Sequence, residues 1–195
     1  MTKAAVLLAK LREVFRYRHV DGCLYKGTDR VMFVCEATAD NFPCILLKTG
    51  EGFQIDNPTQ KEIHMIAVDH CLLTNRDHGI QKCDCVIFDE QFFCFVELKL
   101  NVRKNISDNI KEAETQLGET IQFFERNLGT DEPFFGFIRE AYIVMPRKFS
   151  PKQPASFVNR REKFATRYKT ILFLENTKSF IDSKTDVPFN DSRSN

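Results

Sequence analysis

The stretch CDCVIFDEQFFCFVELKL, residues 83–100, decides the fold. It holds two apolar runs, 82–88 and 93–100, joined by the segment 89–92, a pattern that is typical of two strands and a turn. Both runs are apolar on both faces, which is typical of central strands in a sheet that is covered on each side. We therefore expect a β-hairpin in the middle of a sheet.

Three charged residues interrupt these strands on one face. Side chains of a strand alternate between its faces, so a four-residue turn pairs Phe88 with Phe93 and sets Asp84 opposite Glu97, with Cβ atoms about 5 Å apart. Lys99 follows two residues later on the same face. Two carboxylates so close repel each other unless a proton or a cation lies between them. Oxygen ligands of this kind suit Mg²⁺ or Mn²⁺, and such an ion beside an ammonium group can promote phosphodiester hydrolysis.

Asp84, a gap of twelve residues and the triplet Glu97-Leu98-Lys99 resemble the core motif of the PD-(D/E)xK nuclease superfamily. The resemblance implies a restriction-endonuclease-like α/β fold, in which a central mixed sheet is flanked by helices. It implies a Mg²⁺- or Mn²⁺-dependent nuclease that acts on DNA, with Asp84 and Glu97 as metal ligands and Lys99 as the catalytic lysine. The proline that often precedes the aspartate in that superfamily is Cys83 in this chain.

The same resemblance suggests further site residues. Many members add an acidic metal ligand from the first helix, where Glu13 is the first candidate and Glu36 the second. One exonuclease branch carries a glutamine, and a tyrosine four residues later, on the helix after the motif, whereas Gln116 is followed here by Thr120. Gln116 lies off the apolar stripe of its helix, so we expect it to face the site as an additional catalytic residue.

The rest of the chain alternates short strands with helices. Apolar periodicity predicts helices over 2–16, 107–128 and 156–168, with Ser107 as an N-cap and Gly129 as a C-terminal stop. Strands are expected at 31–35, 44–47, 52–55, 137–145 and 170–174, while the segment 61–73 is open between helix and strand. We expect one domain over 1–181, built around one mixed sheet, and a polar, flexible tail over 182–195.

Basic residues are concentrated near the end of the predicted domain. The whole chain has 28 Lys and Arg against 27 Asp and Glu, which excludes binding of a polyanion by bulk charge. The segment 139–169 nevertheless holds nine basic residues against two acidic ones. A basic lobe beside an acidic metal site has the polarity that a nuclease needs. Arg160, Arg161 and Lys163 are the expected phosphate contacts, and by analogy with the resembled nucleases a homodimer would present two sites to the two DNA strands.

The cysteine and hydropathy patterns indicate where the protein works. Seven cysteines are an odd number, and most, such as Cys35, Cys71 and Cys94, sit in apolar runs. This pattern predicts reduced thiols in a core and a cytoplasmic protein. No apolar run approaches the roughly 18 residues that cross a bilayer, so no membrane partner is expected.

Other interpretations stay open. An inactive module of the same fold that binds nucleic acid or a protein partner is the alternative function. An interaction or immunity-type protein would use the charged hairpin only as structure. A zinc site is less favoured than core packing, because the chain has no C-x-x-C spacing; its candidate ligands would be Cys83, Cys85, Cys94, His64, His70 and His78. The Phe-rich runs 92–95 and 134–137 are expected in the core rather than as a platform for stacked bases.

Overall fold

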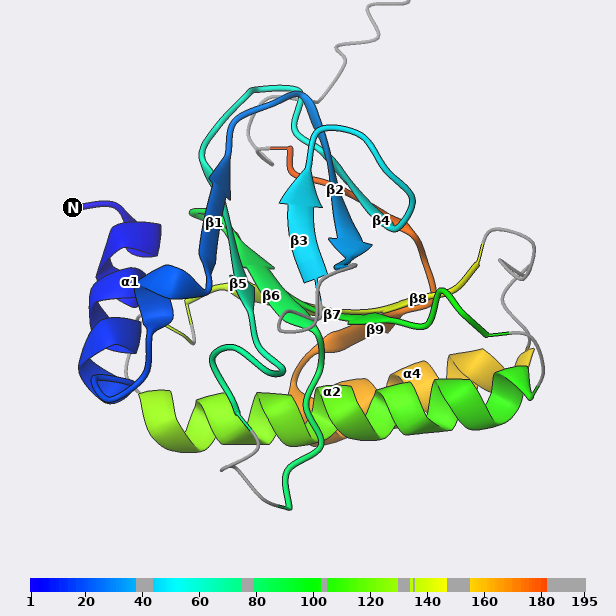
Figure 1. Cartoon of the computed structure of the whole chain (residues 1–195). Helices are drawn as coiled ribbons and strands as arrows, with labels where there is room; N and C mark the ends of the chain where they lie inside the picture. The colour runs from blue at the N-terminus through cyan, green and yellow to red at the C-terminus, as the bar shows by residue number, and fades with distance from the viewer. Residues whose placement is uncertain are drawn as a thin grey trace, which may run out of the picture.

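Three layers make up the described part of the chain in the computed structural model: a four-stranded sheet, a six-stranded sheet and a layer of helices (Figure 1). The structure describes residues 1–37, 44–74, 79–102, 105–129, 134, 136–146 and 155–181. The predicted tail 182–195 lies outside these residues, as do His78 and three residues of the basic segment, Arg147, Lys148 and Lys152.

The six-stranded sheet forms the middle layer, with strand order β1-β5-β6-β7-β8-β9. Its strands are β1 (Leu24–Gly27), β5 (Ile63–Ala67), β6 (Cys85–Phe88), β7 (Phe92–Leu98), β8 (Ile138–Val144) and β9 (Ile171–Phe173). Neighbouring strands are antiparallel along the series β1, β5, β6 and β7, whereas β7, β8 and β9 are parallel to one another. The predicted central hairpin is confirmed, and Phe88 pairs with Phe93 as expected. The ambiguous segment 61–73 contains the strand β5.

A second sheet corrects the expectation of a single one. It has the order β10-β4-β2-β3 and consists of β2 (Val31–Glu36), β3 (Cys44–Leu47), β4 (Phe53–Asp56) and β10 (Thr177–Ser179). Its buried residues Val34 and Phe53 share one hydrophobic cluster with Met65 and Ile87 of the larger sheet. The larger sheet is apolar on both faces, so one face needs a cover, and these short strands provide it.

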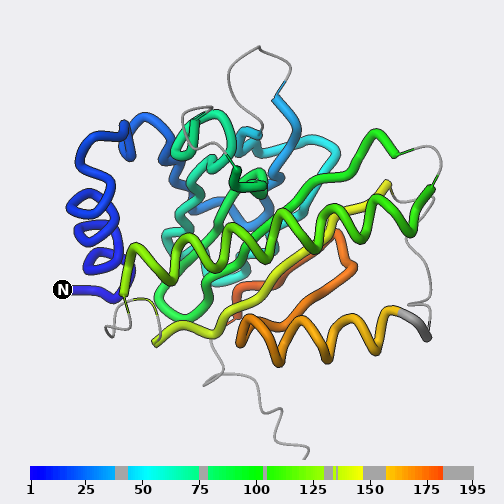
Figure 2. The backbone as a smooth tube through the Cα atoms, turned by 90° about the horizontal axis from the view of Figure 1, so that it is seen from below, coloured from blue at the N-terminus to red at the C-terminus, as the bar shows by residue number. Residues whose placement is uncertain are grey.

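Helices cover the opposite face of the larger sheet. They are α1 (Lys3–Val14), α2 (Ile106–Leu128) and α4 (Ala155–Tyr168), and α2 and α4 run side by side when viewed from below (Figure 2). The predicted N-cap Ser107 is wrong: the N-cap of α2 is Asn105, whose φ of 56° is a left-handed conformation that asparagine tolerates. Gly129 ends α2 as predicted. Within the described residues, no helix has the length and apolar character needed to span a bilayer.

Phenylalanine rings fill the space between the helices and the larger sheet. Phe93 is fully buried on β7. Its ring centroid lies 5.6 Å from that of Phe88 and 5.1 Å from those of Phe95 and Phe134. Phe137 is buried in the same cluster. The prediction that these residues belong to the core, and not to a base-stacking surface, is thereby confirmed for them.

Replacing Phe93 by alanine should lower the free energy of unfolding by about 3–5 kcal/mol, because the cavity would lie among five other rings. Urea denaturation followed by circular dichroism measures the change. The matched control is Tyr17→Ala, since the Tyr17 side chain is 88% exposed, and its effect should stay within about 0.5 kcal/mol. Equal losses in the two variants would contradict the placement of Phe93.

Two of the cysteines are joined. Cys23 and Cys71 form a disulfide, with Cα atoms 5.7 Å apart. The expectation that Cys71 is a reduced thiol is therefore wrong. The physical reason is a pairing that is distant in sequence: the Cys23 carbonyl accepts a hydrogen bond from the Ala67 N–H at 3.0 Å, which brings the two segments together. The other five cysteines are buried free thiols, as expected.

Thiol counting tests this disulfide directly. Alkylation of the unfolded protein without a reductant should modify five cysteines, and alkylation after reduction should modify all seven, because only the bonded pair resists the reagent. Intact-mass spectrometry measures both numbers. Seven modified cysteines in the unreduced sample would show that the pair is not bonded.

Candidate active site

The ends of β6 and β7 bring two carboxyl groups together. Cys85 pairs with Val96, and the next step of this register sets Asp84 opposite Glu97, as predicted. Asp84 lies in a bend directly before β6, and its Oδ2 accepts a hydrogen bond from the Leu98 N–H at 2.6 Å. This bond holds the Asp84 carboxyl group against the end of β7.

Lys99 completes the group from the residue after β7. Its ammonium Nζ lies 3.1 Å from Glu97 Oε1 and 3.0 Å from Glu112 Oε1. It also donates a hydrogen bond to Gln116 Oε1 at 2.8 Å. Its charge acts on Asp84 as well, where it lowers the pKa. The structure thus brings four of the predicted site residues together where α2 crosses the larger sheet: Asp84, Glu97, Lys99 and Gln116.

Gln116 and Thr120 attach α2 to the chain segment that leads into β6. The Gln116 side-chain amide donates a hydrogen bond to the Lys82 carbonyl at 3.2 Å. The Thr120 hydroxyl accepts one from the Cys83 N–H at 2.9 Å and donates one to the Gln116 carbonyl at 2.8 Å. Thr120, which stands where the exonuclease branch has a tyrosine, therefore fixes the backbone directly before Asp84.

Burial raises the pKa of both carboxyl groups. It raises the pKa of Asp84 to about 7, although the Leu98 hydrogen bond and the Lys99 charge act in the opposite direction. Glu97 is 2% exposed, and burial followed by the charge of Asp84 raises its pKa well above the ordinary range. Burial lowers the pKa of Lys99, but the charge of Glu97 and the hydrogen bonds to Glu112 and Glu97 outweigh it, so the net shift is upward.

These two carboxyl groups fit a hard divalent cation. Glu97 Oε2 is buried and has no hydrogen-bond partner among the described residues. A dication relieves both the mutual repulsion of Asp84 and Glu97 and the cost of ionising them in the interior. In the part of the chain that the structure describes, no three His, Cys, Asp or Glu side chains gather closely enough to hold a metal ion. Two carboxylates suffice for Mg²⁺ or Mn²⁺, because such ions keep water and substrate phosphate oxygens as their other ligands.

The structure does not bring Glu13 to this group. Glu13 is exposed on α1, and its carboxylate pairs with Lys10 of the same helix at 3.3 Å. The second candidate, Glu36, lies at the end of β2, and its charge contributes to the raised pKa of Asp84. Its Oε2 accepts a hydrogen bond from the Asn101 side chain at 2.6 Å. Glu36 is therefore the better placed of the two acids.

Two acidic residues of this site were missed in the sequence. Glu112 reaches Lys99 from α2, and its spacing of four from Gln116 was an available signal, because such residues share a helix face. Asp69 follows β5, and its charge raises the pKa of Asp84. No local pattern marks Asp69, since its position depends on the pairing of β5 with β6.

The cysteines near the site belong to the core. Cys85 and Cys94 lie in the cluster between the two sheets, whereas Cys83 lies in the cluster on the helix side. In a continuous strand Cys83 and Cys85 would share a face, but the chain bends at Asp84 before β6 begins, so the two cysteines lie on opposite sides of the larger sheet. This separation leaves the less favoured zinc interpretation without a common ligand face.

Two of the three predicted phosphate contacts on α4 share a groove. Arg160 and Lys163 both line the groove between α2 and α4, where Arg160 pairs with Glu114 of α2 at 2.8 Å. The Arg161 guanidinium instead lies 4.8 Å from the centre of the Phe173 ring. The three side chains therefore do not form one patch, because Arg161 lies apart from the other two.

No protein-family model, no curated protein and no solved structure matches this chain.

The raised pKa of Asp84 predicts a pH-dependent stability in the absence of divalent ions. The folded protein keeps a proton that the unfolded chain, with an ordinary pKa of 3.8, releases. The free energy of unfolding should therefore fall as the pH rises from about 4 to about 7. Asp84→Asn removes the charge and keeps a hydrogen-bond acceptor, so it should be more stable than the wild type by about 4 kcal/mol at about pH 8, with no difference below about pH 4.

Urea denaturation across this pH range, with a chelator present, provides the measurement. Asp29→Asn is the control, because Asp29 forms a surface pair with Lys48 at 3.2 Å, and its effect should stay below about 0.5 kcal/mol throughout. Identical pH profiles for the wild type and Asp84→Asn would rule out a buried, protonated Asp84.

Proposed function

We propose that the protein is a divalent-metal-dependent nuclease of the PD-(D/E)xK type, which hydrolyses phosphodiester bonds of DNA by direct attack of water. The observation that carries this proposal is the convergence of Asp84, Glu97 and Lys99 at one end of the central hairpin. The element order supports a restriction-endonuclease-like fold: α1, the antiparallel strands β5, β6 and β7, then α2, and then β8 parallel to β7.

Asp84 and Glu97 would hold the Mg²⁺ or Mn²⁺ ion. Such an ion, when bound, polarises a phosphate oxygen and lowers the pKa of water. Since burial raises the pKa of both carboxyl groups, each must release its proton before it can act as a ligand. Metal binding should therefore strengthen as the pH rises through about 7.

Lys99 is the residue that meets the reacting groups. Its ammonium has three donors, and its present partners are Glu97, Glu112 and Gln116. The Glu112 side chain is 59% exposed, so it is the partner that a substrate phosphate or the attacking water can replace. In that position the ammonium orients the water or stabilises the charge on the phosphate. Gln116 keeps the ammonium in place, because its own amide is bound to the Lys82 carbonyl.

A plasmid-cleavage assay with Mg²⁺ or Mn²⁺ tests the proposal. Asp84→Ala and Lys99→Ala should each lower the cleavage rate by about 100-fold or more, because one removes a metal ligand and the other the charge at the reacting phosphate. Lys10→Ala and Glu13→Ala are matched controls, since they break an exposed pair on α1, and they should leave the rate unchanged. Thermal melts of all four variants confirm that each is folded.

Cleavage that persists in both site variants would remove the site assignment. Loss of activity in Glu13→Ala would restore Glu13 as a metal ligand, against its position in the structure. Binding of DNA without cleavage in either ion would favour a non-catalytic module of the same fold.

A further inference from the structure

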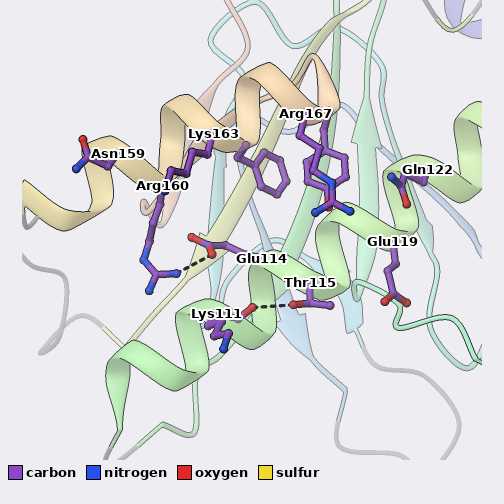
Figure 3. Close-up of a pocket in the computed structure, with 11 residues that line it drawn as sticks. Lys111, Glu114, Thr115, Glu119, Gln122, Asn159, Arg160, Lys163 and Arg167 are labelled. Carbon is purple, nitrogen blue, oxygen red and sulfur yellow. Dashed lines mark hydrogen bonds and ion pairs between the residues drawn. The ribbon is translucent and has the colours of Figure 1, made fainter.

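A groove of about 690 Å³ lies between α2 and α4 (Figure 3). A volume of this size falls in the range of ordinary ligand sites. The groove uses a different face of α2 from the one that carries Glu112 and Gln116 toward Lys99. Four basic and two acidic residues line it: Lys111, Arg160, Lys163, Arg167, Glu114 and Glu119.

The acidic residues of the groove already have partners. Glu114 neutralises Arg160 across the groove at 2.8 Å, as the dashed line in Figure 3 shows. Glu119 Oε2 accepts a hydrogen bond from the Gln81 N–H at 2.5 Å. The groove thus holds one internal ion pair, and three further cations stand against the single charge of Glu119, which leaves an excess of two positive charges.

Three cations supply this excess. Lys111 extends from α2, whereas Lys163 and Arg167 extend from α4 (Figure 3). Among the described residues, none of the three has a carboxylate within ion-pair distance, and the Arg167 guanidinium rests 5.1 Å from the centre of the Tyr168 ring. Charges that are left without an opposite charge in a groove attract an anionic ligand.

We propose that this groove binds phosphate groups of a nucleotide chain, through Lys111, Lys163 and Arg167. The proposal rests on the proposed function, because a nucleic acid is the polyanion that a nuclease must hold. The proposal changes the set of phosphate contacts that the sequence predicted. Lys163 stays in the set, and Lys111 and Arg167 are added to it. Arg160 leaves the set, because Glu114 neutralises its charge. Phosphate contacts of this kind position a nucleic acid without reading its sequence.

The helix α2 connects the groove with the catalytic group. Lys111 and Glu112 are neighbours in sequence, and they point to the groove and to Lys99 respectively. A helix with its side chains is about 10–12 Å across, and phosphates of one strand repeat about every 3.4 Å along a duplex. A DNA whose scissile phosphate lies at Lys99 therefore needs only a few nucleotides to reach the groove.

Binding of a short fluorescein-labelled DNA duplex, followed by anisotropy without divalent ions, tests the proposal. The double variant Lys163→Gln/Arg167→Gln should bind about tenfold more weakly at low salt, and the slope of log K against log salt should fall by about two. The control, Lys26→Gln/Lys48→Gln, changes the net charge equally but removes surface cations that pair with Glu62 and Asp29. It should bind within about twofold of the wild type.

The groove proposal predicts that Glu114→Gln strengthens the binding of DNA, whereas the double variant weakens it. The substitution keeps the size of the side chain and releases Arg160 from its partner, so the groove gains one positive charge. The affinity should rise and the salt slope should steepen by about one. A groove that is only structural would show weaker or unchanged binding in this variant.

Direct binding of adenosine 5′-monophosphate, measured by titration calorimetry, separates the two sources of nucleotide phosphate. If DNA is bound and cleaved but the double variant equals the control, the groove proposal fails while the nuclease proposal stands. If the monophosphate binds the wild type and not the double variant, while DNA is neither bound nor cleaved, the groove binds free nucleotides and the nuclease proposal fails. If neither ligand distinguishes the double variant from the control, the groove is not a phosphate site.

Discussion

The burial of two adjacent carboxyl groups, Asp84 and Glu97, is the constraint on which the rest of the site depends. An ionised carboxylate loses several kcal/mol of solvation in a protein interior, and two of them also repel each other. The hairpin that carries them is flanked by β5 and β8, so it cannot move into solvent to relieve this cost. A proton on the carboxyl groups and the Lys99 ammonium, 3.1 Å from Glu97 Oε1, offset this cost, and a bound divalent cation would offset it as well.

The long helix α2 converts this constraint into a defined geometry. Its apolar stripe, which includes Leu117 and Phe124, packs on the ring cluster of the larger sheet. That packing fixes the rotation of the helix, so Gln116 and Thr120 must face the segment before β6. The same rotation places Lys111 on the groove side, and one packing interface therefore orients both the proposed catalytic group and the proposed phosphate contacts.

The sequence predicted the hairpin and its site because both depend on short-range rules. Side chains of a strand alternate between its faces, and this alternation together with the length of one turn places Asp84 opposite Glu97. The periodicity of the following helix places Gln116 on the side that faces Lys99. The sequence could not predict the second sheet, the position of Asp69 or the disulfide of Cys23. Each depends on chain segments that are distant in sequence and meet only in the folded state, and an alternating apolar strand looks the same in either sheet.

The second sheet supports the site from the opposite face of β7. Lys178 of β10 lies 2.9 Å from Glu140 of β8, and the Tyr142 hydroxyl donates a hydrogen bond to the same carboxylate at 2.7 Å. A buried ion pair of this kind adds little net stability, but breaking it is costly, so it holds the two sheets in one register. Because both faces of β7 are covered, the Glu97 carboxyl group is buried from solvent, and this burial keeps its pKa high. The second sheet therefore acts on the site mainly through burial, and Glu36 at the end of β2 is its one direct electrostatic contribution among the described acids that act on Asp84.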